Sequence, residues 1–396
     1  MRVCVGIDVA KEVHWASAVD DAGGVLFDSR LPNDPEAIGG LLAELRSFGE
    51  AEVAVGLDVI GGIAGLLQAM LTASDARIVH VPGLAVNRAR EGTVGGESKS
   101  DPRDARVIAE QVRTRRDLRP VPAASELDLE IRMLVGRRGD LVGDQTRRLS
   151  RMHDLLVSIH PGLERALDLT TKGALWLLAR YVAPAEIRRA GKRRIVAHLG
   201  RAGGLRDSGM EALAEAALSA AKAQRVAVPG ERVAAALVRE LATEALAVRE
   251  RLAGLDRDLE TLLGEHPDAA IVRSLPGMGT VLTAEFIAEV GDLSRFRSAD
   301  ALASAAGLAP VLRQSGKVRY LRRANGGNKA LKRVFYQSAF CSLHSPTSQA
   351  FYARKRREGK RHHQALIALA RRRVGVLWAM LRDRRPFEPR SRPLTA

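Results

Sequence analysis

Apolar and polar positions in the first 120 residues alternate between short apolar runs and longer segments with one apolar face. The short runs predict five β-strands: RVCVGIDVA, HWASAVDDAGG, GGVLFDSRLP, EVAVGLDV and ARIVHVPG. The longer segments predict helices at 34–49, 61–74 and 100–115. The resulting order β-β-β-α-β-α-β-loop-α is typical of a ribonuclease-H-like α/β sheet, although it also fits half of an actin-like ATPase.

Two long amphipathic segments in the middle of the chain, 126–161 and 231–263, predict helices. Residues 165–228 between them predict a smaller helical insertion. The second long segment carries apolar residues at heptad spacing: Val248, Leu252, Leu255, Leu259 and Leu262. This seam predicts a coiled-coil connector, formed either within one chain or by pairing with a second chain in a dimer or tetramer.

From Ile271 onward the sequence LPGMG joins two predicted helices. It looks like a helix-hairpin-helix element, in which Gly277 and Gly279 let backbone N–H groups approach a phosphate, with a plain helix–helix turn as the alternative. We therefore expect three parts. They are an α/β domain at 1–120, the helical connector at 121–267 and a mainly α C-terminal domain with a basic tail at 268–396.

Charge is distributed unevenly along the chain, whose formal net charge is +16. Residues 1–120 hold 14 Lys or Arg against 18 Asp or Glu, whereas residues 351–396 hold 14 against 3. A basic back half favours a polyanionic partner, most simply nucleic acid, over an Arg-rich surface that only aids solubility. The sequence has two distant cysteines, and it shows neither a long apolar run nor a signal-peptide pattern. These features predict a cytoplasmic, nucleoid-associated protein without a membrane span.

Four aspartates form the first candidate site. Asp8 and Asp58 each end a predicted strand, at the edge where α/β sheets bind ligands. Asp101 and Asp104 lie three residues apart at a helix start and so share one face. Converging carboxylates repel one another unless a cation neutralises them, and hard oxygen ligands suit Mg²⁺ or Mn²⁺. Capping, strand ending or solvation is the alternative for each, and helix capping is a strong one for Asp101.

Ser315 is the second candidate, in the middle of a run without acidic residues. It is either a turn residue on a phosphate-binding surface or a nucleophile that the surface serves. Nearby cations could hold a phosphate and stabilise developing charge. Eight Lys or Arg in this run are predicted to bind nucleic acid: Arg313, Lys317, Arg319, Arg322, Arg323, Lys329, Lys332 and Arg333. The Asn-Gly-Gly turn inside the run leads into a basic helix whose open start suits a phosphate contact.

Two lysines near the aspartates are further nucleic-acid-binding candidates. Lys11 follows the first carboxylate in GIDVAK and either reaches a phosphate or is an ordinary surface lysine. Lys99 lies just before the helix that carries Asp101 and Asp104.

Together these residues resemble the DEDD-type insertion-sequence transposases, the family numbered one-ten, which is related to the pilin-gene invertases. GIDVAK, the acid after the fourth strand and KSDPRDARVIA are similar to the front half of that family. The later segments are similar to its C-terminal transposase domain: LPGMGTVLTAEFIAEVGDLSRFRSADALASAAGLAPVLRQSGKVR and GGNKALKR.

The resemblance implies a RuvC-like first domain whose metal-binding tetrad is Asp8, Asp58, Asp101 and Asp104. It implies that Ser315 joins covalently to DNA during strand exchange, in a composite site of both domains. It also implies recombination of donor and target double-stranded DNA and a structured guide RNA encoded by the element. The family's second acidic position is commonly Glu, so Asp58, one methylene shorter, requires an adjusted ligand geometry.

Three other interpretations stay open on the sequence. An actin-like ATPase or sugar kinase needs further Gly-rich phosphate loops, which the helical middle and basic tail do not offer. A RuvC-like nuclease or junction resolvase would use Ser315 only to contact phosphate. If the protein only bound nucleic acid and were not an enzyme, the four aspartates would have no functional role.

Overall fold

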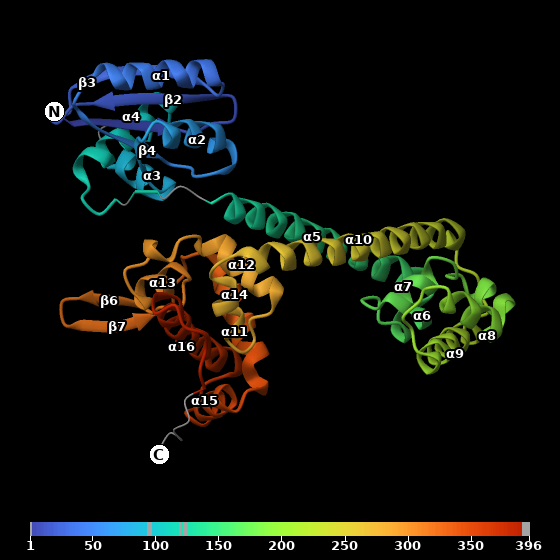
Figure 1. Ribbon diagram of the computed structural model, residues 1–396. Helices are drawn as coiled ribbons and strands as arrows, with labels where there is room; N and C mark the ends of the chain where they lie inside the picture. Colours follow the sequence, from blue (N-terminus) through green and yellow to red (C-terminus); the bar gives the residue numbers. More distant parts are fainter. Residues whose placement is uncertain (1, 93–96, 119, 122–124, 390–396) are drawn as a thin grey trace. The chain divides into compact units, whose positions relative to one another are not determined.

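The chain forms two compact units, Met1–Ala124 and Ser125–Ala396, in a computed structural model that describes residues 2–92, 97–118, 120–121 and 125–389 (Figure 1). Each unit has its own core and is described on its own. The second unit contains both the connector and the C-terminal domain that the sequence separates at residue 267, so that finer division stays a prediction.

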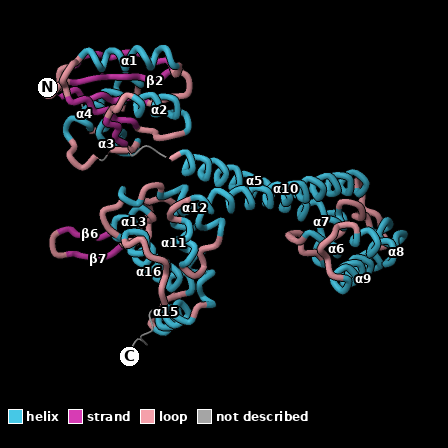
Figure 2. Tube along the Cα trace, in the orientation of Figure 1, coloured by secondary structure: helices cyan, strands magenta, loops and turns pink. Residues whose placement is uncertain are grey.

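The N-terminal unit is built on a five-stranded mixed sheet with the order β3-β2-β1-β4-β5. Figure 2 shows this sheet in magenta with helices in cyan around it. Its first three strands form an antiparallel meander, and β4 and β5 run parallel to β1. The predicted α/β class and the predicted order of the five strands along the chain are therefore confirmed, and they fit a ribonuclease-H-like arrangement. The predicted loop after the fifth strand is wrong in part, because a helix forms at Gly83–Glu91. The strands are β1 Arg2–Asp8, β2 Val13–Val19, β3 Val25–Pro32, β4 Glu52–Leu57 and β5 Arg77–His80.

Helices complete this unit because each has an apolar face that the sheet buries. Leu41 of α1 and Leu71 of α2 belong to one core with Val5 and Ile7 of β1. Ile108 and other residues of α4 form a second core with Cys4 and Ala54. The helices are α1 Pro35–Ser47, α2 Gly65–Ala73 after a 3-10 turn at Gly62–Ala64, α3 Gly83–Glu91 and α4 Asp101–Thr114.

One close contact sets how near α4 lies to the sheet. A Cβ atom on Gly6 of β1 would lie 2.1 Å from the carbonyl oxygen of Ala105 and 2.2 Å from the nitrogen of Ala109. Only glycine permits this approach of helix backbone to strand. Since Asp104 directly precedes Ala105, the same contact brings Asp104 close to the strand that ends in Asp8.

The second unit begins with two long helices, α5 Glu126–Ile159 and α10 Glu231–Glu265, packed side by side (Figure 1). Arg138 pairs with Asp256 at 2.7 Å and Arg148 with Glu244 at 2.7 Å, so the helices run antiparallel. Pairing within one chain is thus present, while a coiled coil and pairing with a second chain stay predictions. The predicted insertion is confirmed as a helical subdomain: α6 Pro161–Ala166, α7 Lys172–Leu178, α8 Pro184–Gly200 and α9 Asp207–Ala223.

The rest of the second unit is mainly helical, as the sequence predicts. Its helices are α11 Ala269–Ser274, α12 Thr280–Val290, α13 Ala299–Ala305, α14 Lys329–Cys341, α15 Pro346–Arg357 and α16 His362–Arg382, with 3-10 turns at Leu293–Arg295 and Ser342–His344. A β-hairpin of β6 Val311–Ser315 and β7 Val318–Arg322 was not predicted. No helix in the described parts of the chain combines the length and apolar character needed to cross a membrane.

Candidate active site

Asp8 and Asp58 lie together at the carboxyl end of the parallel strands, as predicted. Asp8 is the last residue of β1, and Asp58 directly follows β4, which pairs with β1 in parallel. The backbone N–H of Val9 donates a hydrogen bond of 3.1 Å to Oδ1 of Asp58. The imidazole of His80, at the end of β5, lies 3.1 Å from the backbone carbonyl oxygen of Asp58. Val9, which directly follows Asp8, therefore fixes the Asp58 carboxylate beside the end of β1.

Crowding of negative charge changes the acidity of Asp8. Burial, followed by the charges of Asp58, Asp104 and Asp101, raises the pKa of Asp8 from its ordinary 3.8 to about 7. Lys99 opposes this rise, so it too lies within electrostatic range. Burial also raises the pKa of Asp58, against hydrogen bonds that lower it. The other three predicted acids and Lys99 thus all lie within electrostatic range of Asp8.

Asp104 is held by an arginine that the sequence did not single out. Arg90 of α3 donates from Nη1 to both carboxylate oxygens of Asp104, at 2.6 and 2.8 Å. The two side chains are 9% and 7% exposed, so this is a buried ion pair. Nη2 of Arg90 also donates to the side-chain oxygen of Asn87.

Asp101 is the exposed first residue of α4. The N-cap position of this helix is occupied by Ser100 and not by Asp101.

Asp8, Asp58 and Asp104 line a cleft of about 390 Å³, whereas Asp101 is not among its lining residues. The donor set is suited to a hard divalent cation, because carboxylate oxygens crowd one cleft and their mutual repulsion is large enough to shift a pKa. Among the described residues, however, no three acids, histidines or cysteines are arranged closely enough to hold a metal ion as they stand. Arg90 accounts for part of this, because it engages both oxygens of Asp104. The cleft is lined by Asp8, Asp58, Gly83, Leu84, Val86, Asn87, Arg90, Lys99 and Asp104.

Ser315 lies at the tip of the β6–β7 hairpin. It is exposed, ends β6 and pairs with Val318, which leaves Gly316 and Lys317 as a two-residue loop. Gly316 has φ +54°, the value that a type II′ turn requires at its first central position. The serine is therefore both a strand end and part of a turn, and its hydroxyl is open to a ligand.

The hairpin register separates the basic residues into two faces. Directly opposed residues of antiparallel strands point to the same face, and every second residue along a strand does so too. Arg313 and Arg322 therefore share the face of Ser315, together with Tyr320. Arg319 and Gln314 lie on the opposite face. Of the predicted cations on the strands, the structure brings only two to the side of the serine.

The helix that follows the hairpin carries three further predicted cations. Its start is capped, because Oδ1 of Asn328 accepts a hydrogen bond of 2.9 Å from the backbone N–H of Leu331. Arg333 pairs at 2.9 Å with Glu285 of α12, whose side chain is 8% exposed. Burial and, secondly, the charge of Arg323 lower the pKa of Lys332, so these two cations lie near each other. Lys329 is the first residue of α14 and is exposed.

The LPGMG turn connects α11 to α12, and its two glycines differ. Gly277 has φ +83°, and a Cβ atom there would lie 2.6 Å from the carbonyl oxygen of Ser338 in α14. Packing against α14 is therefore sufficient to explain Gly277. Gly279 is the N-cap residue of α12 and has open space around its α-carbon. Phosphate binding by either glycine, and a helix-hairpin-helix assignment, stay predictions.

Lys11 stands apart from the cleft. It is exposed in the bend after β1, and its backbone carbonyl accepts a hydrogen bond of 3.2 Å from the side chain of Asn33. It does not line the carboxylate cleft, so its predicted phosphate contact would have to involve a longer ligand.

Family models match both halves of the chain. Residues 5–161 match a DEDD transposase model, and residues 269–353 match the model described as the transposase IS116/IS110/IS902 family. The insertion element IS116 protein of Streptomyces clavuligerus is 44% identical over 391 residues, which is 98% of this chain and 96% of that one. The chain belongs to the IS116/IS110/IS902 family of transposases.

Two further relatives agree with this assignment. The insertion element IS900 protein of Mycobacterium paratuberculosis is 40% identical over 98% of the transposase and 97% of its own length. The pilin gene-inverting protein of Moraxella bovis is 32% identical over 144 residues, covering 34% of the transposase and 45% of its own length. The predicted family is confirmed, and the protein is an enzyme that cleaves and rejoins DNA.

Proposed function

We propose that this transposase moves an insertion sequence with two sets of residues, a divalent-metal carboxylate cluster and a serine nucleophile. Asp8, Asp58, Asp101 and Asp104 form the cluster, and Ser315 is the nucleophile. The observation that supports the cluster best is the rise of the pKa of Asp8 to about 7, which the other three aspartates help to cause. A cleft in which acids oppose each other's ionisation favours the binding of a cation.

Mg²⁺ or Mn²⁺ fits the donor set of the cleft. When bound, such an ion stabilises negative charge on the oxygens of a phosphodiester. The N–H of Val9 donates to one oxygen of Asp58, and backbone hydrogen bonds from Asp58 and Val59 also stabilise this carboxylate, which lies within electrostatic range of Asp8. Both oxygens of Asp104 accept hydrogen bonds from Arg90, so this contact must be broken or shared when Asp104 ligates a metal. Lys99, on the cleft wall, is placed to contact a substrate phosphate.

Ser315 would form a covalent bond to DNA. Its Oγ attacks a backbone phosphorus, the bond from phosphorus to one sugar oxygen breaks, and the leaving oxygen takes up a proton. The serine proton passes to a base, and a free sugar hydroxyl later reverses the step to rejoin the strands. Exposure of Ser315 on a hairpin tip permits this attack, and Arg313 and Arg322 on the same face would neutralise charge on the phosphate.

A structured RNA and a homo-oligomer complete the proposal. The family resemblance implies an RNA encoded by the element that pairs with donor and target DNA. Residues 351–396 hold 14 basic and 3 acidic residues, and this imbalance supports binding of a large polyanion. Exposed residues on α5, among them Met133 at 66% and Val157 at 54%, leave apolar area for a second chain. The protein would act on DNA in the cytoplasm.

Covalent trapping tests the role of Ser315. The purified protein is incubated with its element's end DNA and RNA, and denaturing gels then detect protein–DNA adducts. We expect Ser315→Ala to abolish adducts and recombination while DNA binding persists, and Gln314→Ala, on the other face of the hairpin, to retain both. Metal-dependent cleavage that survives Ser315→Ala would instead support a RuvC-like nuclease in which the serine only contacts phosphate.

A further inference from the structure

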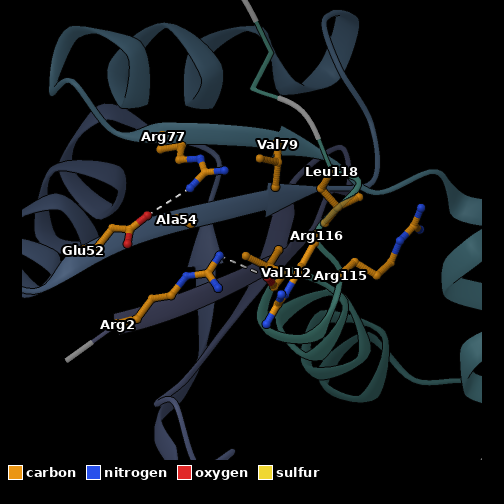
Figure 3. A pocket seen from close by; sticks show the side chains of 9 residues that line it. All are labelled: Arg2, Glu52, Ala54, Arg77, Val79, Val112, Arg115, Arg116 and Leu118. Atoms are coloured by element: carbon orange, nitrogen blue, oxygen red, sulfur yellow. Dashed lines mark hydrogen bonds and ion pairs between the residues drawn. The ribbon is translucent and has the colours of Figure 1, made fainter.

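A second cavity in the N-terminal unit, of about 310 Å³, is lined by four arginines (Figure 3). We call it the arginine pocket. Its cations come from three elements that the fold brings together: Arg2 begins β1, Arg77 begins β5, and Arg115 and Arg116 directly follow α4. The remaining lining residues are Glu52, Ala54, Val79, Val112 and Leu118.

Carboxylates neutralise only half of this positive charge. Arg77 pairs with Glu52 at 2.9 Å, and Arg115 pairs with Asp117 at 2.6 Å and extends away from the other arginines in Figure 3. Neither Arg2 nor Arg116 forms an ion pair with any carboxylate in the described parts of the chain.

Arg2 makes one long side-chain hydrogen bond, and its Nε has no hydrogen-bond partner. Its Nη2 donates to the backbone carbonyl of Val112 at 3.4 Å, a long hydrogen bond. Its Nε is buried without a hydrogen-bond partner. A buried donor without a partner is costly unless a ligand or water completes it. Two guanidinium groups without a carboxylate partner therefore line one cavity, in a region whose net charge over residues 1–120 is negative.

The position of the pocket separates it from the carboxylate cleft. Arg2 and Asp8 are the first and last residues of β1. Six residue steps of about 3.3 Å place these two ends roughly 20 Å apart. A small phosphate in the pocket could not reach the cleft, whereas a polynucleotide could occupy both ends of the sheet. No aromatic side chain is among the lining residues, so the pocket is suited to phosphate and not to a stacked base.

We propose that the arginine pocket binds a backbone phosphate of nucleic acid, about 20 Å from the carboxylate end of β1. Arg2 and Arg116 supply the charge that holds the phosphate. Planar guanidinium groups bind phosphate oxygens in pairs, which favours this assignment over a general positive field. The contact extends the nucleic-acid footprint of the N-terminal unit to the end of the sheet opposite its aspartates.

Binding titrations on the full-length transposase test the proposal. The double variant Arg2→Gln/Arg116→Gln is compared with Arg30→Gln/Arg46→Gln, which removes the same charge from two exposed positions of the same unit. Dissociation constants are measured by fluorescence anisotropy over a range of KCl concentrations, separately for duplex DNA, single-stranded RNA and inorganic phosphate. Thermal unfolding establishes that both variants are folded.

We expect the pocket variant to bind nucleic acid about tenfold more weakly near 0.1 M salt, with its salt slope reduced by roughly one per lost contact, and the control to change little. Weakening of DNA alone, RNA alone or both identifies which strand carries the phosphate. Equal effects of the two double variants would overturn the proposal, as would a loss confined to inorganic phosphate. Ser315 adducts are measured in parallel, so that a failure of the serine hypothesis is recognised separately.

Discussion

Arg90 and Asp104 form a buried ion pair, in which Nη1 of Arg90 contacts both carboxylate oxygens, on the wall of the cleft that Asp8 and Asp58 line. Asp104 is one of the acids expected to hold a divalent ion, yet both of its oxygens accept hydrogen bonds from one arginine. Guanidinium and metal ion are alternative cations for the same carboxylate. Binding of a metal by Asp104 therefore requires that its contact with Arg90 be broken or shared.

We predict that Arg90→Gln raises the affinity for Mn²⁺ roughly tenfold, because a competing positive charge is removed. The metal-free variant should lose about 3–5 kcal/mol of unfolding free energy, since Asp104 stays buried without its partner. Calorimetry with Mn²⁺ measures the first effect and denaturant unfolding the second.

Arg90→Lys keeps the charge but lacks the second nitrogen that bonds Asn87, so its Mn²⁺ affinity and its stability should fall between those of the wild type and Arg90→Gln. Arg88→Gln, exposed on the same helix, is the control for charge alone. An Arg90→Gln protein that is folded and binds Mn²⁺ more weakly than the wild type would show that Arg90 positions Asp104 for the metal and does not compete with it.

The stability of the metal-free protein should depend on pH through Asp8. The pKa of Asp8 is about 7 in the folded chain and 3.8 ordinarily, so folding favours its protonated form. This contribution is complete below pH ~4 and is lost as pH rises through about 7. We expect the Tm in EDTA to fall between pH 5 and 8, and Mg²⁺ to restore part of it at pH 8.

Asp8→Asn should flatten this pH dependence and remove the response to Mg²⁺. Glu44→Gln, at an exposed position on α1, should leave both unchanged. Differential scanning fluorimetry at several pH values makes the comparison. If Asp8→Asn follows the wild-type curve, the charge repulsion at Asp8 does not govern the pH response.

The convergence of the aspartates could be predicted because it depends on local rules. Strand ends at Asp8 and Asp58 and the three-residue spacing of Asp101 and Asp104 are visible in the sequence. Arg90 could not be placed in this way. Its helix, GLAVNRARE, follows Pro82 and has few apolar residues, so it was predicted as a loop. Pairing of Arg90 with Asp104 depends on how α3 packs against α4, which no local pattern encodes.

The hairpin around Ser315 was missed for a different reason. The density of basic charge in 311–322 led to its interpretation as a surface segment. Two short runs, VLRQS and VRYLR, flank Gly-Lys, which is a loop of the length and composition that hairpins use. That pattern could have been recognised. The division of its cations between two faces then follows from the register, which the two-residue loop fixes.

The two glycines of the LPGMG turn should respond differently to alanine. Gly277→Ala places a Cβ atom 2.6 Å from the backbone of α14 at φ +83°, so we expect a loss of about 2 kcal/mol or more in unfolding free energy. Gly279→Ala has room and should leave stability nearly unchanged. Thermal and denaturant unfolding measure both. A Gly279→Ala protein with normal stability and weaker DNA binding would support the predicted phosphate contact at the start of α12.

Arg313 and Arg319 provide a matched test of the hairpin as a catalytic surface. Both are exposed arginines on its strands, but only Arg313 shares the face of Ser315. If the serine attacks a phosphate held on that face, Arg313→Ala should slow adduct formation by roughly 10²-fold, as loss of a charge-stabilising donor does. Arg319→Ala should weaken binding slightly and leave the rate at saturating DNA unchanged. Single-turnover kinetics separate the two effects. Equal rate losses in both variants would mean that the hairpin contributes only general positive charge, because a general field does not distinguish its faces.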